Sequence, residues 1–234
     1  MRILQIGSKG VQIYFLQRLL NKAAARSNGR LHKIAEDGIF GSIETQPAVR
    51  AFQSQALSPR LKVDGIVGIH TWHALGLKVE INHYIILRAQ TSDWSCWQAA
   101  VTMISEVFGR NLSINTSIDH MQYYLTSGME LGGDTQLARE LGWQKLNHSP
   151  WLEELIGIMR RTPIYVTGIL TATNGAHAVV FGGLFSDGEA SGTVIKVYNP
   201  SPVGCGRIHP FFYDNMVSPI SGSPFLPRDF LIPQ

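Results

Sequence analysis

The chain reads Gln90-Thr-Ser-Asp-Trp-Ser-Cys96-Trp97 immediately before a mostly apolar run that stops at Gly109. The apolar residues of this run recur at the spacing of one helical face: Trp97, Ala100, Val101, Ile104, Val107 and Phe108. The free N–H groups at a helix N-terminus lower the pKa of a thiol, because they stabilise the thiolate. The pattern therefore predicts a helix that begins at Cys96 and makes this residue a candidate nucleophile. The alternative is that Cys96 is a buried, inert cysteine.

Two later residues add the groups that a nucleophilic thiol needs. His177 begins the apolar run His-Ala-Val-Val-Phe-Gly-Gly, and Asn199 closes the run Thr-Val-Ile-Lys-Val-Tyr-Asn-Pro. An imidazole can accept the thiol proton and later protonate a leaving amine, and a side-chain amide can orient that imidazole. The Gln90 amide and the Cys96 backbone N–H are candidate donors of an oxyanion hole. The ordinary alternatives are a histidine that starts a strand, an Asn-Pro turn and a loop glutamine.

The region after residue 80 is expected to place helices first and strands afterwards, which is an α+β arrangement. The expected helices lie near 116–126, 134–142 and 150–161, and the expected strands at 163–170, 176–184 and 193–198. Residues 79–90 are expected to be a linker that runs into a strand. Loops at about 110–135 and 183–192 are expected to form the pocket walls. The predicted domains are 1–80 and 81–234.

The region before residue 80 contains an internal repeat: Asp37-Gly-Ile-Phe-Gly41 and Asp64-Gly-Ile-Val-Gly68. Asp-Gly favours a turn with one left-handed residue. The threonines that follow, Thr45 and Thr71, are candidate N-caps of short helices. Upstream, Ile13, Leu16, Leu19 and Leu20 share one helical face. The pattern predicts a small unit of three helices.

Composition excludes several classes of function. The chain has 234 residues, with 44% hydrophobic and 16% charged residues, which is typical of a globular protein. Residues 1–80 carry 11 Lys/Arg and 5 Asp/Glu, whereas 81–234 carry 9 and 12. A basic N-terminal module suits an anionic polymer, but the absence of a Lys/Arg run speaks against nucleic acid. No apolar stretch has the length of a membrane span, so no membrane insertion is expected.

Cysteine and histidine usage narrows the chemistry further. The two cysteines, Cys96 and Cys205, are too few for a disulfide framework, and one bridge would consume the candidate nucleophile. No Cys/His cluster has the spacing of zinc ligands, so neither a metal nor another cofactor is expected. The N-terminus has no apolar h-region of a signal peptide, so synthesis in the cytosol is expected.

Residues 1–78 resemble the bacterial peptidoglycan-binding domain. The matching motifs are Leu-x-x-Gly-Ser-x-Gly, a Leu-Gln-x-Leu-Leu helix and the Asp-Gly-x-x-Gly-x-x-Thr repeats. The resemblance implies binding to the cell wall, with Asp37 and Asp64 as candidate substrate-binding residues. One departure is that Thr45 follows Gly41 by four residues rather than three. The alternative is a module that keeps the fold without binding glycan.

The C-terminal part resembles papain-like cysteine peptidases, in a bacterial branch that includes type III effector proteases and, more distantly, bacteriocin-leader peptidases. The matching residues are Gln90-x5-Cys96-Trp97, His177-Ala-Val-Val, and Asn199-Pro-Ser-Pro followed by Tyr213. The resemblance implies a helix-plus-antiparallel-sheet domain with a Cys-His-Asn triad and Gln90, and Trp97 is a candidate substrate-binding residue. His177 follows Cys96 by only 81 residues, which implies a pared-down fold. This branch often has Asp where the chain has Asn199.

Together, the two resemblances imply a cysteine peptidase or amidase directed to peptidoglycan. They suggest an exported antibacterial toxin, such as a type VI secretion effector with a cognate immunity protein, active in the periplasm or cell wall of a target cell. Three alternatives stay open: a cysteine protease that cleaves proteins in a target cell, a phage endolysin, and a binding protein with a decayed site. The sequence does not decide the bond cleaved or the delivery route.

Overall fold

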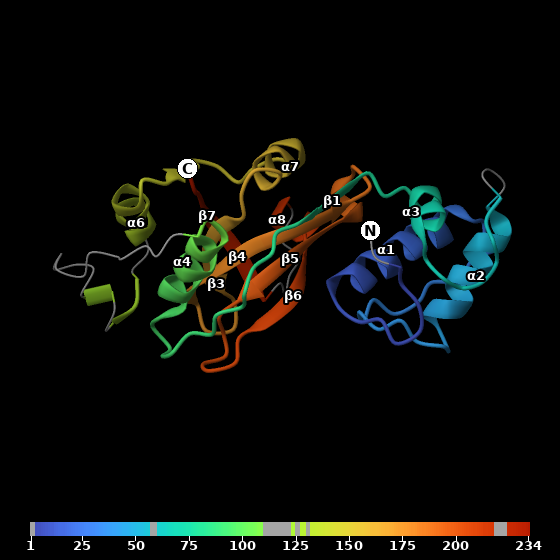
Figure 1. Ribbon diagram of the computed structural model, residues 1–234, viewed down its shortest axis with the longest axis horizontal. Coiled ribbons are helices and arrows are strands. Elements are labelled where there is room, and N and C mark those ends of the chain that lie inside the picture. Colours follow the sequence, from blue (N-terminus) through green and yellow to red (C-terminus); the bar gives the residue numbers. More distant parts are fainter. Residues whose placement is uncertain (1–2, 57–59, 110–122, 125–126, 130–131, 218–223) are drawn as a thin grey trace. The chain divides into compact units, whose positions relative to one another are not determined.

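The computed structural model describes residues 3–56, 60–109, 123–124, 127–129, 132–217 and 224–234. The chain divides into two compact units (Figure 1). The first comprises residues 1–80 and takes in a second segment, 185–194. The second comprises residues 81–184 and 195–234.

The first unit contains the three helices that the sequence predicts. They are α1 (Val11–Arg26), α2 (Thr45–Gln55) and α3 (Ile69–Leu75). The apolar face of α1 is buried, including Ile13, Leu16 and Leu19. Phe15 stacks on Trp72 of α3 with ring centroids 5.7 Å apart. Burial of these side chains supplies the main stabilisation of so small a unit.

A buried glutamine organises each Asp-Gly turn. Gln53 is 2% exposed, and its Nε2 donates to Asp64 Oδ1, to the Ile66 carbonyl and to Thr71 Oγ1 at 3.2, 2.9 and 3.3 Å. Its Oε1 accepts the Gly65 N–H at 2.9 Å. One side chain thereby holds the turn and the start of the next helix together.

The first copy of the repeat has the same set of bonds. Gln17 is 1% exposed, and its Nε2 donates to Asp37 Oδ1, the Ile39 carbonyl and Thr45 Oγ1 at 2.7, 3.2 and 3.2 Å. Its Oε1 accepts the Gly38 N–H at 2.9 Å. The internal repeat of the sequence is therefore a repeat of one hydrogen-bond network.

The predicted capping role of the two threonines is wrong. Glu44 occupies the N-cap of α2 and Gly68 that of α3, and neither end has a side-chain cap. Thr45 and Thr71 instead turn their hydroxyl groups inward to the buried glutamines. A hydrogen bond between the threonine hydroxyl and a buried glutamine stabilises the fold more than a solvent-exposed N-cap bond would.

Glycine is required within each turn. Gly38 and Gly65 have φ values of +72° and +73°, in the left-handed region that side chains disfavour. A Cβ at Gly38 would also lie 2.2 Å from the Tyr14 ring. The Asp-Gly dipeptide therefore has both a conformational and a steric cause.

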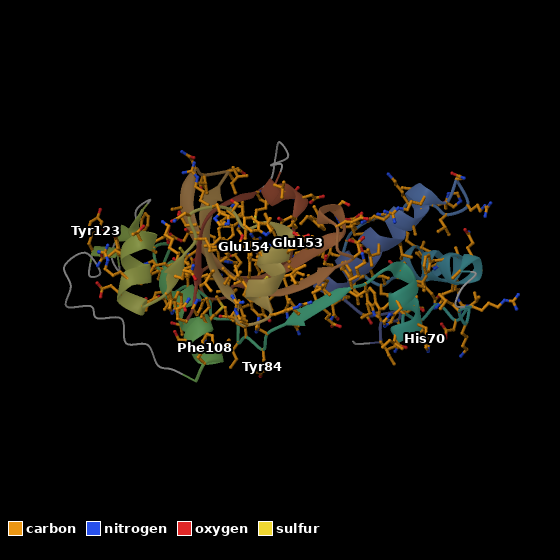
Figure 2. All side chains as sticks on the ribbon, turned by 90° about the horizontal axis from the view of Figure 1, so that it is seen from above. His70, Tyr84, Phe108, Tyr123, Glu153 and Glu154 are labelled. Atoms are coloured by element: carbon orange, nitrogen blue, oxygen red, sulfur yellow. The ribbon has the colours of Figure 1, made fainter. Side chains whose placement is uncertain are left out.

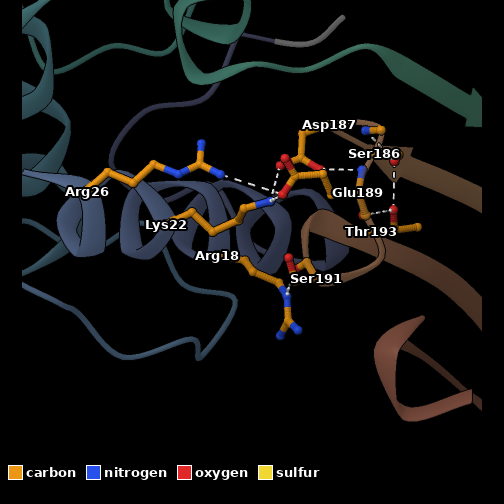
Figure 3. A network of polar contacts seen from close by, with 9 residues as sticks. Arg18, Lys22, Arg26, Ser186, Asp187, Glu189, Ser191 and Thr193 are labelled. Carbon is orange, nitrogen blue, oxygen red and sulfur yellow. Dashed lines mark hydrogen bonds and ion pairs between the residues drawn. The ribbon is translucent and has the colours of Figure 1, made fainter. Parts of the chain in front are cut away.

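The segment 185–194 joins α1 through charged side chains (Figure 3). Lys22 contacts the carboxylates of Asp187 and Glu189. Within the segment, the hydroxyl groups of Ser186 and Thr193 lie 2.6 Å apart, and both residues are fully buried. The short 3₁₀-helix η1 (Ala190–Gly192) completes the segment.

An antiparallel sheet forms the centre of the second unit. Its strand order is β2-β7-β3-β4-β5-β6, and β1 also pairs with β4 (Figure 1). The strands are β1 (Val79–Asn82), β2 (Gln144–Lys145), β3 (Ile164–Leu170), β4 (Gly175–Ser186), β5 (Thr193–Asn199), β6 (Arg207–Phe212) and β7 (Phe225–Ile232). The β3–β4 register runs from Ile164 opposite Phe181 to Leu170 opposite Gly175.

Helices supply the other half of the core. They are α4 (Cys96–Val107), α6 (Gly133–Leu141), α7 (Leu152–Met159) and α8 (Asp214–Val217). Side chains of α4 and α6 share a buried cluster with Tyr165, Ala178, Val180 and Tyr198 of the sheet. The apolar face that the sequence shows packs on the strands, except that Phe108 lies beyond the end of α4 and is exposed.

The α+β class is confirmed. The order of helices before strands holds only in part, because β1 and β2 come before α7, and α8 lies between β6 and β7. Helices α6 and α7 and strands β3, β4 and β5 lie where the sequence predicts them. Figure 2 shows Glu153 and Glu154 on α7, in the first turn, where acidic residues favour a helix. The helix expected near 116–126 falls almost wholly outside the described residues.

Two expectations about the sheet are wrong or incomplete. The strand expected at the end of 79–90 comes at its start, as β1, and Ile85 instead anchors an irregular segment in the buried cluster. Strand β7 escapes prediction because Pro227, Arg228 and Asp229 interrupt its apolar pattern. The register between β3 and β7 shifts at this point, between Thr167 and Gly168.

Candidate active site

A cavity of about 570 Å³ in the second unit brings several of the sequence-predicted residues together. Gln90, Cys96, Trp97 and His177 all line it. They come from the loop before α4, the first turn of α4 and strand β4. Of the two segments expected to form its walls, 110–135 contributes residues 127–129 and Asp134, which lies in α6, and 183–192 contributes none. From Phe185 onward, the latter segment belongs to the first unit.

Cys96 is the first residue of α4 and is 8% exposed. Burial raises the pKa of its thiol, because a thiolate is poorly solvated there. The backbone N–H groups of Ala178, Trp97 and Cys96 itself lower that pKa and only partly offset burial. Ala178 follows His177 directly, so the thiol lies beside the strand that carries the imidazole. The thiol is therefore protonated at rest.

His177, on strand β4, is hydrogen-bonded through one ring nitrogen only among the described residues. Its Nε2 lies 2.8 Å from Asn199 Oδ1. An amide oxygen can only accept, so Nε2 carries the hydrogen and the neutral ring leaves Nδ1 free to take a proton. The Ser201 N–H also donates to Asn199 Oδ1 at 2.8 Å, which fixes the amide orientation. Burial lowers the pKa of His177 although the Asn199 bond raises it, so the ring is neutral at pH 7.

Sequence reasoning missed a second histidine at this site. His209 of β6 lies with its Nε2 3.5 Å from Asn199 Nδ2. Its Nδ1 donates to the Pro210 carbonyl at 3.0 Å, so Nε2 is the nitrogen that can accept from the amide. Burial lowers the pKa of His209. Asn199 is thus held between two imidazoles, and no spacing rule in the sequence indicates the second.

Gln90 is tied to the strand end that carries Asn199. Its N–H donates to the Pro200 carbonyl, and its carbonyl accepts the Gly204 N–H, each at 3.0 Å. Its side chain is 5% exposed, and Oε1 makes no hydrogen bond to any described residue. The side-chain oxygen at the cavity is therefore left unused by the fold.

Ser95, which sequence reasoning also missed, shapes the loop between Gln90 and Cys96. Its Oγ accepts the N–H groups of Thr91 and Ser92, both at 3.0 Å. These bonds fold the loop back on itself just before α4 begins. The separation of Gln90 from Cys96 is thereby set by a local turn.

Asp134 is the least expected residue of the cavity wall. It lies in the first turn of α6 and is 4% exposed. Its Oδ2 accepts the Thr167 hydroxyl at 2.7 Å, while Oδ1 has no partner among the described residues. Burial, aided by the charge of Asp229, raises its pKa to about 6 although the Thr167 bond lowers it. An acidic residue at a helix start is common, so nothing in the sequence pattern distinguishes Asp134.

The three candidate substrate-binding residues are placed as follows. Trp97 lines the cavity but is 1% exposed, and its indole N–H donates to the Tyr124 carbonyl at 3.2 Å. The carboxylates of Asp37 and Asp64 accept bonds from the buried glutamines and from backbone N–H groups two residues ahead. Their binding roles stay predictions.

Outside the cavity, the described residues include one more cysteine. Cys205 is a free, exposed cysteine. Within the described ranges, no group of three His, Cys, Asp or Glu side chains is placed to hold a metal ion. No helix in those ranges is long and apolar enough to cross a membrane.

Comparison with protein-family models finds two matches. A peptidoglycan binding domain matches residues 9–75, and the papain-like cysteine protease AvrRpt2 family matches residues 78–204, more than half of the chain. Neither a curated protein nor a solved structure gives a match. The peptidoglycan-binding module is therefore followed by a cysteine protease domain, and the chain belongs to the papain-like cysteine protease AvrRpt2 family.

Proposed function

We propose that the cavity is the active site of a hydrolase that cleaves peptide or amide bonds of peptidoglycan. Cys96 is the nucleophile, His177 the base, Asn199 the residue that orients the base, and Gln90 an oxyanion donor. The observation that carries this proposal is the 2.8 Å bond between His177 Nε2 and Asn199 Oδ1, beside a helix that starts with Cys96. That bond leaves Nδ1 of a neutral ring available.

The reaction follows from this geometry in two halves. In the first, the Cys96 thiol proton passes to His177 Nδ1 while Sγ attacks the substrate carbonyl carbon. The Gln90 amide and the Cys96 N–H stabilise the negative oxygen, and His177 then protonates the amine as the carbon–nitrogen bond breaks. In the second, His177 deprotonates a water that attacks the thioester. The acid is released and Sγ regains the proton.

The N-terminal unit supports peptidoglycan as the substrate. It matches a peptidoglycan binding domain, and residues 1–80 carry an excess of six positive charges. Such a charge concentrates an enzyme on an anionic polymer. The tethered protease domain then meets its substrate at a raised local concentration.

The test is digestion of purified sacculi, with mass spectrometry of the released fragments. The native protein should release peptide-containing fragments, and Cys96→Ala should lower the rate by about 10⁴-fold or more. Cys205→Ala is the matched control, because it removes the exposed cysteine and should leave the rate unchanged. Absence of any wall fragment from the native protein would refute peptidoglycan as the substrate.

A second candidate substrate is protein, because the matched family is described as a protease. In that case the N-terminal unit only localises the enzyme. A panel of folded and unfolded proteins, incubated with the native protein and Cys96→Ala, separates the two candidates. Cleavage of proteins without release of wall fragments would favour this second candidate.

We also propose that the protein acts as an exported antibacterial toxin, as a type VI secretion effector would, in the periplasm or wall of a target cell, and that an immunity protein neutralises it. The pairing of a wall-binding module with a hydrolase supports this role. The test is expression in a bacterial host with and without an added export signal. Lysis should require both the export signal and Cys96. Rescue by the product of a neighbouring gene would identify the immunity protein.

A further inference from the structure

We propose that the Asp134 side of the cavity is a subsite that binds a primary ammonium group on the substrate. This inference rests on the proposed hydrolase function and adds the class of substrate to it: peptides that carry a free amine close to the bond cleaved. Asp134 and Cys96 line the same cavity, so one bound peptide can reach both.

The first argument is an unmet hydrogen bond. Only 4% of Asp134 is exposed, yet its Oδ1 has no hydrogen-bond partner in the described part of the chain. A buried carboxylate oxygen left without a donor is costly, because water no longer solvates it. Such groups in native proteins call for an explanation, and a ligand that supplies the donor is one.

The second argument is the balance of charge. Asp229, also on the cavity wall, is paired with Lys145 at 2.8 Å, so that cation is already engaged. Lys145 also donates to Thr135 Oγ1 at 3.1 Å. Thr167 gives Asp134 a hydrogen bond but no charge. Lys145 lowers the pKa of Asp134 through its charge, but among the described residues no cation forms an ion pair with Asp134.

The third argument concerns the surroundings of Asp134. Tyr165, at the same place in the core, is fully buried and its hydroxyl also lacks a partner among the described residues. Burial, and after it the charge of Asp134, raises the pKa of Tyr165, so the phenol stays protonated and adds no competing charge. Arg228 also lines the cavity but is exposed, so water screens its repulsion of a bound cation. An ammonium group brings the positive charge that this side lacks, together with N–H donors for Asp134 Oδ1.

The test compares pairs of peptides that differ only in one amine. Each pair contains a lysine or its acetylated form, placed in turn at each position around the cleaved bond. At its preferred position, the amine should raise kcat/KM of the native protein by about 10- to 100-fold over the acetylated peptide. Asp134→Asn should remove this preference by slowing only the amine peptide. Glu140→Gln, which removes an exposed acid from the same helix, should keep it.

A pH series sharpens the test. Between pH 7 and pH 5 Asp134 takes up its proton, so the preference for the amine peptide should fall. Asp229, Lys145, Tyr165, Cys96 and Arg228 are the other titratable groups around it, and Cys96 and His177 affect both peptides of a pair equally. The ratio of the two rates therefore removes the titration of Cys96 and His177, and Asp134→Asn then shows which part of the remaining pH dependence belongs to Asp134.

Binding to Cys96→Ala, measured by calorimetry, needs no turnover and gives the same comparison. Equal rates and equal affinities for amine and acetylated peptides would overturn the subsite while leaving the hydrolase intact. If the native protein hydrolyses neither peptide but Cys96→Ala still binds the amine peptide more tightly, the hydrolase proposal is refuted and the subsite is kept. If Asp134→Asn fails to fold, the peptide panel on the native protein still decides, because equal values there refute the proposal.

Discussion

The two units of this protein differ in whether certain buried polar side chains have hydrogen-bond partners. In the first unit, Gln17 and Gln53 each make four hydrogen bonds, and their partner carboxylates have lowered pKa values. Around the cavity of the second unit, Gln90 Oε1 and Asp134 Oδ1 have no partner among the described residues, and Asp134 has a raised pKa. Paired groups hold a fold together, whereas unpaired ones are available to a substrate.

The same substitution, glutamine to leucine, at Gln90 and at Gln53 tests this comparison most directly. Gln90→Leu should lower kcat by about 10²- to 10³-fold, because one oxyanion donor is lost. Its melting temperature should stay equal or rise, since an unbonded amide oxygen is replaced by an apolar group. The measurements are hydrolysis rates and thermal unfolding of the same preparation. A normal rate for Gln90→Leu would remove Gln90 from the mechanism.

Gln53→Leu should show the opposite pattern. It leaves Asp64, Thr71 and two backbone groups without their partner, so the first unit should lose on the order of 3 kcal/mol of unfolding free energy. Hydrolysis of a small soluble peptide should not change. Gln17→Leu is the matched variant in the first copy of the repeat, and urea unfolding measures both. A loss below 1 kcal/mol in both would contradict a structural role for the two networks.

A pair of aspartates tests the comparison through pH. The folded pKa of Asp134, about 6, lies above its ordinary value of 3.8, so its carboxylate costs stability above pH 6, and the cost disappears as pH falls toward 3.8. Asp134→Asn should therefore be more stable than the native protein by roughly 2 kcal/mol at pH 7 and nearly equal at pH 4.

Asp64→Asn should behave in reverse. The Ile66 N–H and the Gln53 amide lower the pKa of Asp64, so its carboxylate contributes stability above pH 3.8, which is lost as pH falls through the folded pKa. The variant should be the less stable protein at pH 7, and the difference should shrink below pH 4. Unfolding curves at pH 4 and 7 measure both variants, and the same sign for the two at pH 7 would break the comparison.

The same contrast explains what the sequence could predict. Helices α1 and α4 follow from apolar periodicity, and the Asp-Gly turns follow from glycine's left-handed freedom, because these causes are local. The pattern also drew attention to Cys96 and His177, which stand where a helix and an apolar strand begin. Their catalytic roles stay predictions until the variants are measured.

What escaped prediction depends on distant partners. Gln17 and Gln53 read as ordinary helix residues, and only the folded turns show that they organise both repeats. Asp134 resembles any acidic residue at a helix start until Thr167, 33 residues later in the chain, is seen to bond it. Because an unpartnered buried oxygen can be recognised only in the folded chain, no pattern in the sequence could have indicated the proposed subsite.

The smallest expected effect concerns His209, the positioning residue behind Asn199. The 3.5 Å contact is long, so His209→Ala should lower kcat only about three-fold and leave KM unchanged, as the loss of a hydrogen bond worth about 0.5–1 kcal/mol predicts. His209 also lowers the pKa of His177 through its charge, so the acid limb of the pH–rate profile should move to slightly higher pH in the variant. His148→Ala, at an exposed histidine paired with Glu154, is the control and should leave both the rate and the limb unchanged. A three-fold loss without movement of the limb would mean that His209 only packs against Asn199, because a purely structural contact has no means of changing the protonation of His177.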